Sequence, residues 1–351
     1  MIMNKYLKHD PMKQLLDTSD PVIRFLTLRD ILGSAADEIE LADAHRSMMQ
    51  SPYVTSLLDS AVDAVLGDTV NFDTYYRGTY WKFAEAVNAG LDNSHSVIRK
   101  TGEFIMDHFC MNSGGFTLHT NPPAEDACIT GEIVRFLLLA GFRDNRIHRS
   151  VEWIIAHQRH DGGWLHSPGN SLLDIFRLLL FRHPGNPGKT DASITRTSCI
   201  YATIACAEAL SLYKNIDITV TRSISKATEY FLTHRLFVDV SDTGVSSRLS
   251  AGRNQNFSVP GYPLVCQYDI LRGLLFIADN DVFSDRRSGD AFNYIISQQD
   301  HNGMLPFRNR GNGMLFTGRE KEKNSVLEMK WVTLNMMRLL KKTGNYTCKS
   351  C

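Results

Sequence analysis

Residues 151–164 read VEWIIAHQRHDGGW, an apolar run with helical spacing that stops at an acid, two glycines and a tryptophan. A second copy of this pattern, FNYIISQQDHNGML, occupies residues 292–305, and Gln158 coincides with Gln299 when the two copies are aligned. A weaker copy ends in SGGF at residues 113–116. Each copy predicts a helix that ends at a glycine turn, after which an apolar side chain packs on the next element. The recurrence of this pattern indicates a repeat built from helices.

Pairs of helices are predicted around these turns, and strand signals are nearly absent. The first helix of each pair is the more apolar one, and these helices are predicted over residues 79–91, 128–140, 199–212, 266–278 and 327–341. The second helices carry more charge, and three of them are predicted over residues 94–109, 220–235 and 286–299. A fourth is predicted to begin after a cap at Asp144 or Asn145 and to run to the turn of residues 157–164.

The difference in polarity between the two kinds of helix predicts how they are layered. A helix that is apolar all round has to be buried on both sides, whereas an amphipathic helix can face water. An inner ring of apolar helices inside an outer ring of amphipathic helices meets both conditions. An open solenoid is the alternative, but it would leave one face of each inner helix in water. The sequence therefore predicts an all-α fold, an α/α toroid in which helix hairpins close into a ring.

The N-terminal part of the chain has its own pattern. Three helices are predicted there, over residues 20–33, 37–50 and 53–66. We expect them to pack on the ring or to complete its first outer layer. Because no polar linker divides the chain, a single domain is predicted. Its parts are N-terminal helices within residues 1–70, repeats over residues 71–342 and a tail over residues 343–351.

Composition excludes several classes of protein. The 351 residues include 38 basic and 38 acidic side chains, so no charge excess points to nucleic acid. No apolar run is long enough to span a bilayer, and no signal peptide is recognised at the N-terminus. Seven cysteines without dense spacing, including the terminal pair Cys348 and Cys351, favour reduced thiols. A cytoplasmic location is the expectation.

The turn of residues 158–164 carries a resemblance to a known family. The pattern Gln158-x-x-Asp161-Gly162-x-Trp164 resembles the QW motif of squalene–hopene cyclases and related triterpene cyclases. The surrounding pattern, from about Thr79 onward, resembles the prenyltransferase/squalene oxidase repeat. This resemblance implies an α/α toroid with a central cavity that takes an isoprenoid-like apolar small molecule. It leaves open whether the protein catalyses a reaction or is a non-catalytic scaffold, and it identifies no protein partner.

Three inner-helix entrances each carry a cysteine, Cys128, Cys199 and Cys266, and the ring would gather these thiols at one rim. Asp126-Ala127-Cys128 resembles the Asp-x-Cys of protein prenyltransferase β subunits, which implies a zinc site. Those enzymes add a histidine from a later inner helix, but the comparable stretch, residues 195–199, reads TRTSC. Zinc accepts mixed sulfur and oxygen ligands, so we expect Asp126, Cys128 and Cys199 as ligands if zinc is the cofactor. The alternative is that these cysteines are small buried residues that let helices approach closely.

Acid-initiated cyclisation is a second hypothesis for the same rim. It needs a protonated carboxylic acid in an aromatic pocket, and the candidates are Asp126 and Asp269, with Tyr268 beside the latter. Tyr201 and Trp331 occupy comparable places in their repeats and are candidate ligand-binding residues, as is Cys266. The chain lacks the Asp-x-Asp-Asp of the cyclases that it resembles. The alternative for Asp269 is an ion pair with Arg272 one turn later.

Two histidines follow the glycine turns at similar distances. His119 and His166 lie three and two residues after the aromatic residue of GGF and GGW, so both are candidates for ligand binding at the rim. The long polar loop of residues 236–263 is a candidate lid or binding loop.

Overall fold

The computed structural model describes residues 5–70, 72, 74, 77–118, 124–166, 198–213, 217–237, 257–307 and 324–346, with only the backbone of residues 324 and 325. Within these ranges all regular elements are helices, and the only β pairing consists of isolated bridges. The fold is therefore all-α, as the sequence predicts. In the same ranges, every helix is too short or too polar to traverse a lipid bilayer.

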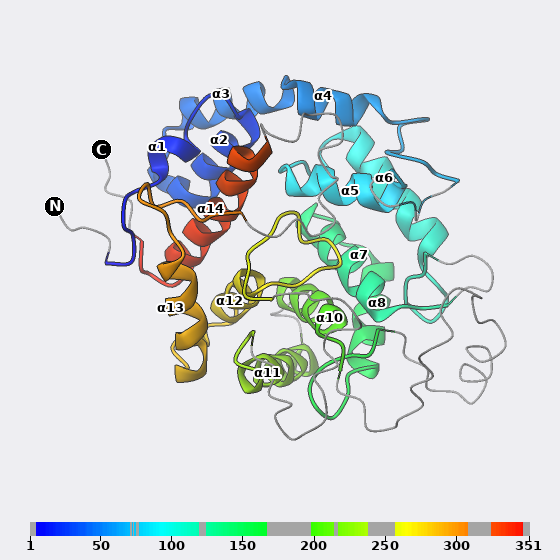
Figure 1. The fold of residues 1–351 in the computed structure, drawn as a ribbon. Coiled ribbons are helices and arrows are strands. Elements are labelled where there is room, and N and C mark those ends of the chain that lie inside the picture. The colour runs from blue at the N-terminus through cyan, green and yellow to red at the C-terminus, as the bar shows by residue number, and fades with distance from the viewer. Residues whose placement is uncertain are drawn as a thin grey trace, which may run out of the picture.

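Inner helices pack side by side around the molecule (Figure 1). They are α5 (Thr79–Asn88), α7 (Ala127–Leu139), α10 (Ile200–Tyr213), α12 (Ile270–Asp279) and α14 (Asn324–Lys342). The last of them, α14, packs against α2 (Pro21–Thr27), which contacts α3 (Glu38–Met49). From α3 the contacts run through α4 (Pro52–Asp59) back to α5. The series of contacts returns to its starting point, so the hairpins form a closed α/α toroid.

Outer helices pair with the inner ones and keep a polar face outward. They are α6 (Ser96–Phe109), α8 (Asn145–Ala156), α11 (Ile218–Thr233) and α13 (Gly289–Ser297), and α13 follows the 3-10 turn η3 (Arg286–Ser288). Short elements complete the N-terminal part, namely α1 (Met12–Leu15), η1 (Leu28–Leu32) and η2 (Gly33–Ala35). The side chains buried on α8 fall on one face, whereas α10 is buried on nearly all sides. This difference agrees with the predicted layers.

Three glycine turns place one repeat against the next. The glycines have a positive φ, and an added Cβ would overlap a backbone carbonyl of the following outer segment. They are Gly114, Gly162 and Gly303, and the carbonyls are those of Arg149, Lys226 and His9. Gln158 reinforces its turn, because its Nε2 donates to the Gly162 carbonyl at 2.9 Å and to the Ser223 carbonyl of α11 at 2.8 Å.

The last turn closes the ring onto the start of the chain. Gln299 Nε2 donates to the Tyr6 carbonyl at 2.7 Å, and its Oε1 accepts the Lys8 backbone N–H at 3.1 Å. The Tyr6 ring also meets the Phe292 ring edge-on, with 5.0 Å between centroids. The N-terminal segment thus takes the place that a following outer helix has at the earlier turns.

Several predicted helices have different bounds in the structure, and two of them show the physical reason. The helix expected over residues 53–66 ends at Asp59, because Asp63 and Ala64 adopt φ values of 52° and 64°, outside the right-handed helical range. The helix expected from residue 266 begins only at Ile270. Its N-cap is Asp269, and Cys266 has a φ of 52° in the preceding loop.

Candidate metal centre

The N-terminus of α7 organises the site through Asp126. Its Oδ1 accepts the Ile129 backbone N–H at 3.0 Å and so caps the helix, while the side chain stays buried. The backbone N–H of Ala127 donates to the His166 carbonyl at 2.9 Å. This backbone bond draws the segment that follows the Trp164 turn back against the start of α7.

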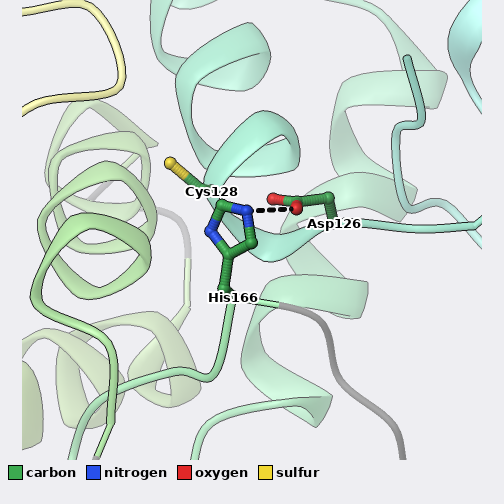
Figure 2. A group of neighbouring side chains, drawn as sticks. All are labelled: Asp126, Cys128 and His166. Carbon is green, nitrogen blue, oxygen red and sulfur yellow. Dashed lines mark ion pairs between the residues drawn. The ribbon is translucent and has the colours of Figure 1, made fainter. Parts of the chain in front are cut away.

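Three ligand-type side chains converge at this point (Figure 2). His166 Nε2 lies 2.9 Å from Asp126 Oδ2, and one ligand atom from each of Asp126, Cys128 and His166 lies within 4.8 Å of the others. Asp126 and Cys128 are buried, whereas the His166 side chain is 60% exposed. The hydrogen bond to Asp126, followed by one to the Cys199 thiol, raises the pKa of His166 to about 10. In the absence of a metal the imidazole is therefore protonated at neutral pH.

All three cysteines predicted at the rim come together here. The neighbouring Cys266 thiol, followed by burial, raises the pKa of Cys128 well above its ordinary value. The Cys199 backbone N–H donates to the Trp164 carbonyl at 2.7 Å, and the Cys199 thiol is the second cause of the raised pKa of His166. Tyr201 lies nearby: burial, and then the charges of Cys199 and Cys128, raise the pKa of Tyr201 to about 12. The ring thus assembles thiols from α7, from the residue before α10 and from the loop before α12.

A buried charge network supports the cluster from the interior of the ring. Arg272 of α12, only 3% exposed, donates through Nη2 to Glu132 of α7 at 2.8 Å and to Glu208 of α10 at 2.6 Å. Arg135 adds a second cation, with its Nε 2.7 Å from Glu208 Oε2. Glu132 also accepts the backbone N–H of Cys266 at 3.2 Å. The network therefore links three inner helices to the loop that carries one of the thiols.

Asp269 and Tyr268 are engaged elsewhere in the interior. Asp269 accepts the backbone N–H groups of Arg272 at 2.8 Å and Gly261 at 2.7 Å, and complete burial raises its pKa to about 6. Arg272 thus meets Asp269 through its backbone, whereas its guanidinium binds the two glutamates. The Tyr268 hydroxyl donates to the Leu236 carbonyl at 2.6 Å. These bonds give both residues a role in holding α12 in place.

Trp331, the candidate from the last repeat, is buried on α14 and stacks on Tyr262, with 4.2 Å between centroids and 7° between the planes. His119 and the terminal cysteines Cys348 and Cys351 lie outside the described residues. So does most of the polar loop, namely residues 238–256.

The convergence of His166 with Asp126 and Cys128 was not predicted. The third zinc ligand was expected near residues 195–199, with Cys199 in that place. The structure instead puts His166 within 4.8 Å of the other two side chains. The usable signal was the position of His166 two residues after the aromatic of the GGW turn, because such a turn reverses the chain toward the preceding inner helix.

Comparison with solved structures finds similarity to the type II terpene cyclase MstE from Scytonema. The apo enzyme matches with a TM-score of 0.47 and 14% identity, over 94% of this chain and 88% of that chain. A complex with the substrate geranylgeranyl dihydroxybenzoate matches with a TM-score of 0.46 and 14% identity, over 94% and 87%. A complex with the product merosterolic acid A matches with a TM-score of 0.46 and 13% identity, over 95% and 97%. No family model and no curated protein matches the chain.

Proposed function

We propose that the protein is a zinc-dependent enzyme that transfers an isoprenoid-like apolar group to a thiol. The observation that carries this proposal is the convergence of Asp126, Cys128 and His166 at the start of α7. One oxygen, one sulfur and one nitrogen donor make a ligand set that zinc accepts, and catalytic zinc sites characteristically use three protein ligands and leave a fourth position for substrate. Zinc bound there would lower the pKa of a coordinated thiol and keep it as the thiolate at neutral pH.

The residues around the ligands fit this role. The Asp126 carboxylate is oriented by its bond to the Ile129 N–H, and the His166 backbone is pinned to α7, so two of the ligands are held before a metal arrives. His166 Nε2 and Asp126 Oδ2 are 2.9 Å apart and share the proton that a metal ion would displace. The Cys199 thiol lies near the His166 ring and contributes to its raised pKa. The chain thus supplies both the ligands and their supports.

The choice of an isoprenoid-like substrate rests on sequence resemblance and on the residues near the candidate metal ligands. The Asp-x-Cys of residues 126–128 resembles that of protein prenyltransferases. Tyr201, half-buried beside Cys199 and Cys128, would offer aromatic surface to an apolar chain. Acid-initiated cyclisation is less well supported, because the oxygens of Asp269 accept the backbone bonds that cap α12.

Metal analysis and an activity assay test the proposal. We expect about one zinc per chain in the purified protein, and we expect Cys128→Ser, His166→Gln and Asp126→Asn each to lose most of it. The matched control is Cys206→Ser, because the Cys206 thiol donates to the Ala127 carbonyl at 3.2 Å, a bond that a serine hydroxyl also makes.

The assay incubates the zinc-loaded protein with farnesyl or geranylgeranyl diphosphate and a cysteine-containing peptide, and mass spectrometry follows thioether formation. Thioether product in wild type, absent from the ligand variants, is the expected result. Protein that binds no zinc at stoichiometric level would remove this mechanism and leave the non-catalytic scaffold.

A further inference from the structure

A cavity of about 480 Å³ lies between α8 and the turn that carries Ser113. Much of its lining comes from one face of α8, because residues three, four and seven positions apart share a face of a helix. These residues are Arg149, Glu152, Trp153 and Ala156, and the lining is completed by His157, Ser113 and Glu125. The volume is in the range of cavities that bind small organic groups. The cavity is separate from the candidate metal ligands, so it calls for a ligand of its own.

Glu125 is a fixed acceptor in the wall of this cavity. Its Oε2 accepts the indole N–H of Trp153 at 3.1 Å, and its Oε1 accepts a hydrogen bond from the Ser113 hydroxyl. Trp153 is held in turn by His157, whose ring stacks on the indole with 4.0 Å between centroids and whose Nδ1 donates to the Trp153 carbonyl at 2.7 Å. A carboxylate has about four lone-pair sites, so each Glu125 oxygen is able to accept a further bond. Both present donors are neutral, and they leave the negative charge of Glu125 unbalanced.

The lining favours a cationic group on an apolar stem. Glu125 and Glu152 bring two carboxylates to the cavity, and Arg149 brings one guanidinium. Carboxylates recognise guanidinium and ammonium groups through charge-assisted hydrogen bonds. The indole of Trp153 and the methyl group of Ala156 offer apolar surface to the methylene stem that carries such a group. Arg149 is a donor for carbonyl oxygens, which a peptide has and a simple amine lacks.

We propose that this cavity binds an arginine or lysine side chain of a peptide, with the cationic group on Glu125 and a peptide carbonyl on Arg149. The cavity also adjoins the candidate metal centre. Asp126 follows Glu125 and has extended backbone, with a φ of −130° and a ψ of 125°, and consecutive side chains of extended backbone point to opposite sides. Glu125 therefore faces the cavity, while Asp126 faces His166.

This arrangement also specifies the thiol substrate of the proposed reaction. A peptide whose basic residue is seated on Glu125 has the rest of its chain beside the metal ligands, so the cysteine and the basic residue belong to the same peptide. That step rests on the proposed function, but binding of the basic peptide does not. The two ideas can therefore fail separately.

The first experiment measures binding of a fluorescently labelled short peptide to the metal-free, full-length protein by anisotropy. The peptide carries a central arginine, and its matched form carries citrulline, which keeps the shape of the side chain and lacks the charge. Because hydrogen bonds between charged partners contribute more than neutral ones, the arginine peptide should bind about ten times more tightly than the citrulline peptide.

Variants locate the binding to the cavity. Glu125→Gln should lose about tenfold in affinity for the arginine peptide. The matched control, Glu103→Gln, changes an exposed carboxylate of α6 outside the cavity and should bind as wild type does. Ala156→Phe fills the cavity from an exposed position on α8 and leaves Glu125 unchanged, so it should also abolish binding. Urea midpoints equal to that of wild type show that the variants are folded.

The outcomes separate the two proposals. Equal affinity for the arginine and citrulline peptides, wild-type affinity in folded Glu125→Gln or Ala156→Phe, or binding of spermidine but not of the peptide overturns the cavity as a peptide site. The second experiment gives the zinc-loaded protein cysteine peptides that contain arginine or citrulline, and follows thioether formation. Binding of the arginine peptide by a protein that holds no zinc supports the cavity and removes the proposed enzyme. Thioether formation at the same rate with both peptides overturns the assigned thiol substrate and leaves the metal centre standing.

Discussion

Replacing Gly162 by alanine should destabilise the ring in two separable ways. The residue has a φ of 89°, and left-handed backbone costs an ordinary residue about 1–2 kcal/mol. In addition, the new Cβ would overlap the Lys226 carbonyl of α11, and overpacking of this kind costs about 1–3 kcal/mol. The sum predicts that Gly162→Ala loses about 2–5 kcal/mol of unfolding free energy.

Two other glycines isolate the two contributions. Gly344 has a φ of 68° but no atom within 4 Å of an added Cβ, so Gly344→Ala should lose only the backbone contribution of about 1–2 kcal/mol. Gly289 has a φ of −61° and equally free surroundings at the start of α13, so Gly289→Ala should be neutral or gain up to about 1 kcal/mol.

Urea titration followed by circular dichroism measures the three variants against wild type, with midpoints compared where the slope of the transition is unchanged. The order of stability should be Gly289→Ala, then Gly344→Ala, then Gly162→Ala. If Gly162→Ala were no less stable than Gly344→Ala, the turn would not press against α11, and the account of how neighbouring repeats are joined would be wrong.

Three further substitutions test the interior. Arg272→Met should lower the unfolding free energy by about 3–5 kcal/mol in urea titrations, because the charges of Glu132 and Glu208 then lack this partner. Adding Glu132→Gln to this variant should restore part of the lost stability, because it removes one of the two charges. Ionised Asp269 opposes folding above its pKa of about 6, and this penalty disappears below 3.8. The stability of wild type relative to Asp269→Asn should therefore rise by about 2 kcal/mol from pH 8 to pH 4, and a constant difference would contradict the burial argument. Trp164→Ala should lower the urea midpoint by an amount equivalent to about 3–5 kcal/mol, because it empties a fully buried site.

Local signals predicted most helices well. Asp144 caps α8, as one of the two residues expected there, and Gly141 ends the preceding helix with a φ of 84°. Capping and glycine turns act within a few residues, so the sequence shows them directly. The start of α12 was predicted four residues too early, because the apolar pattern continues upstream of Asp269. The hydrogen bond that the Arg272 N–H donates to the Asp269 side chain shows where the helix begins.

The candidate site was predicted only in part, for a physical reason. Asp126 and Cys128 are two positions apart, so their proximity follows from the sequence alone. His166 reaches them because the chain returns after α8, and this return depends on tertiary packing rather than on local preference. The contact between Glu132 and Arg272 spans 140 positions, and no pattern near either residue indicates it. Sequence periodicity thus predicts the ring. Which residues of neighbouring helices meet inside it depends on how the helices align when the ring closes.

The bond between Lys8 and Gln299 has a consequence for the order of folding. The first partner leaves the ribosome 291 residues before the second. The hairpins between them can therefore pack on their neighbours during synthesis, but the circle cannot shut until Gln299 has been made. Until that moment, the apolar surfaces of the first and last segments both lack their final cover, and a chaperone that binds exposed apolar segments would find its sites at these two ends.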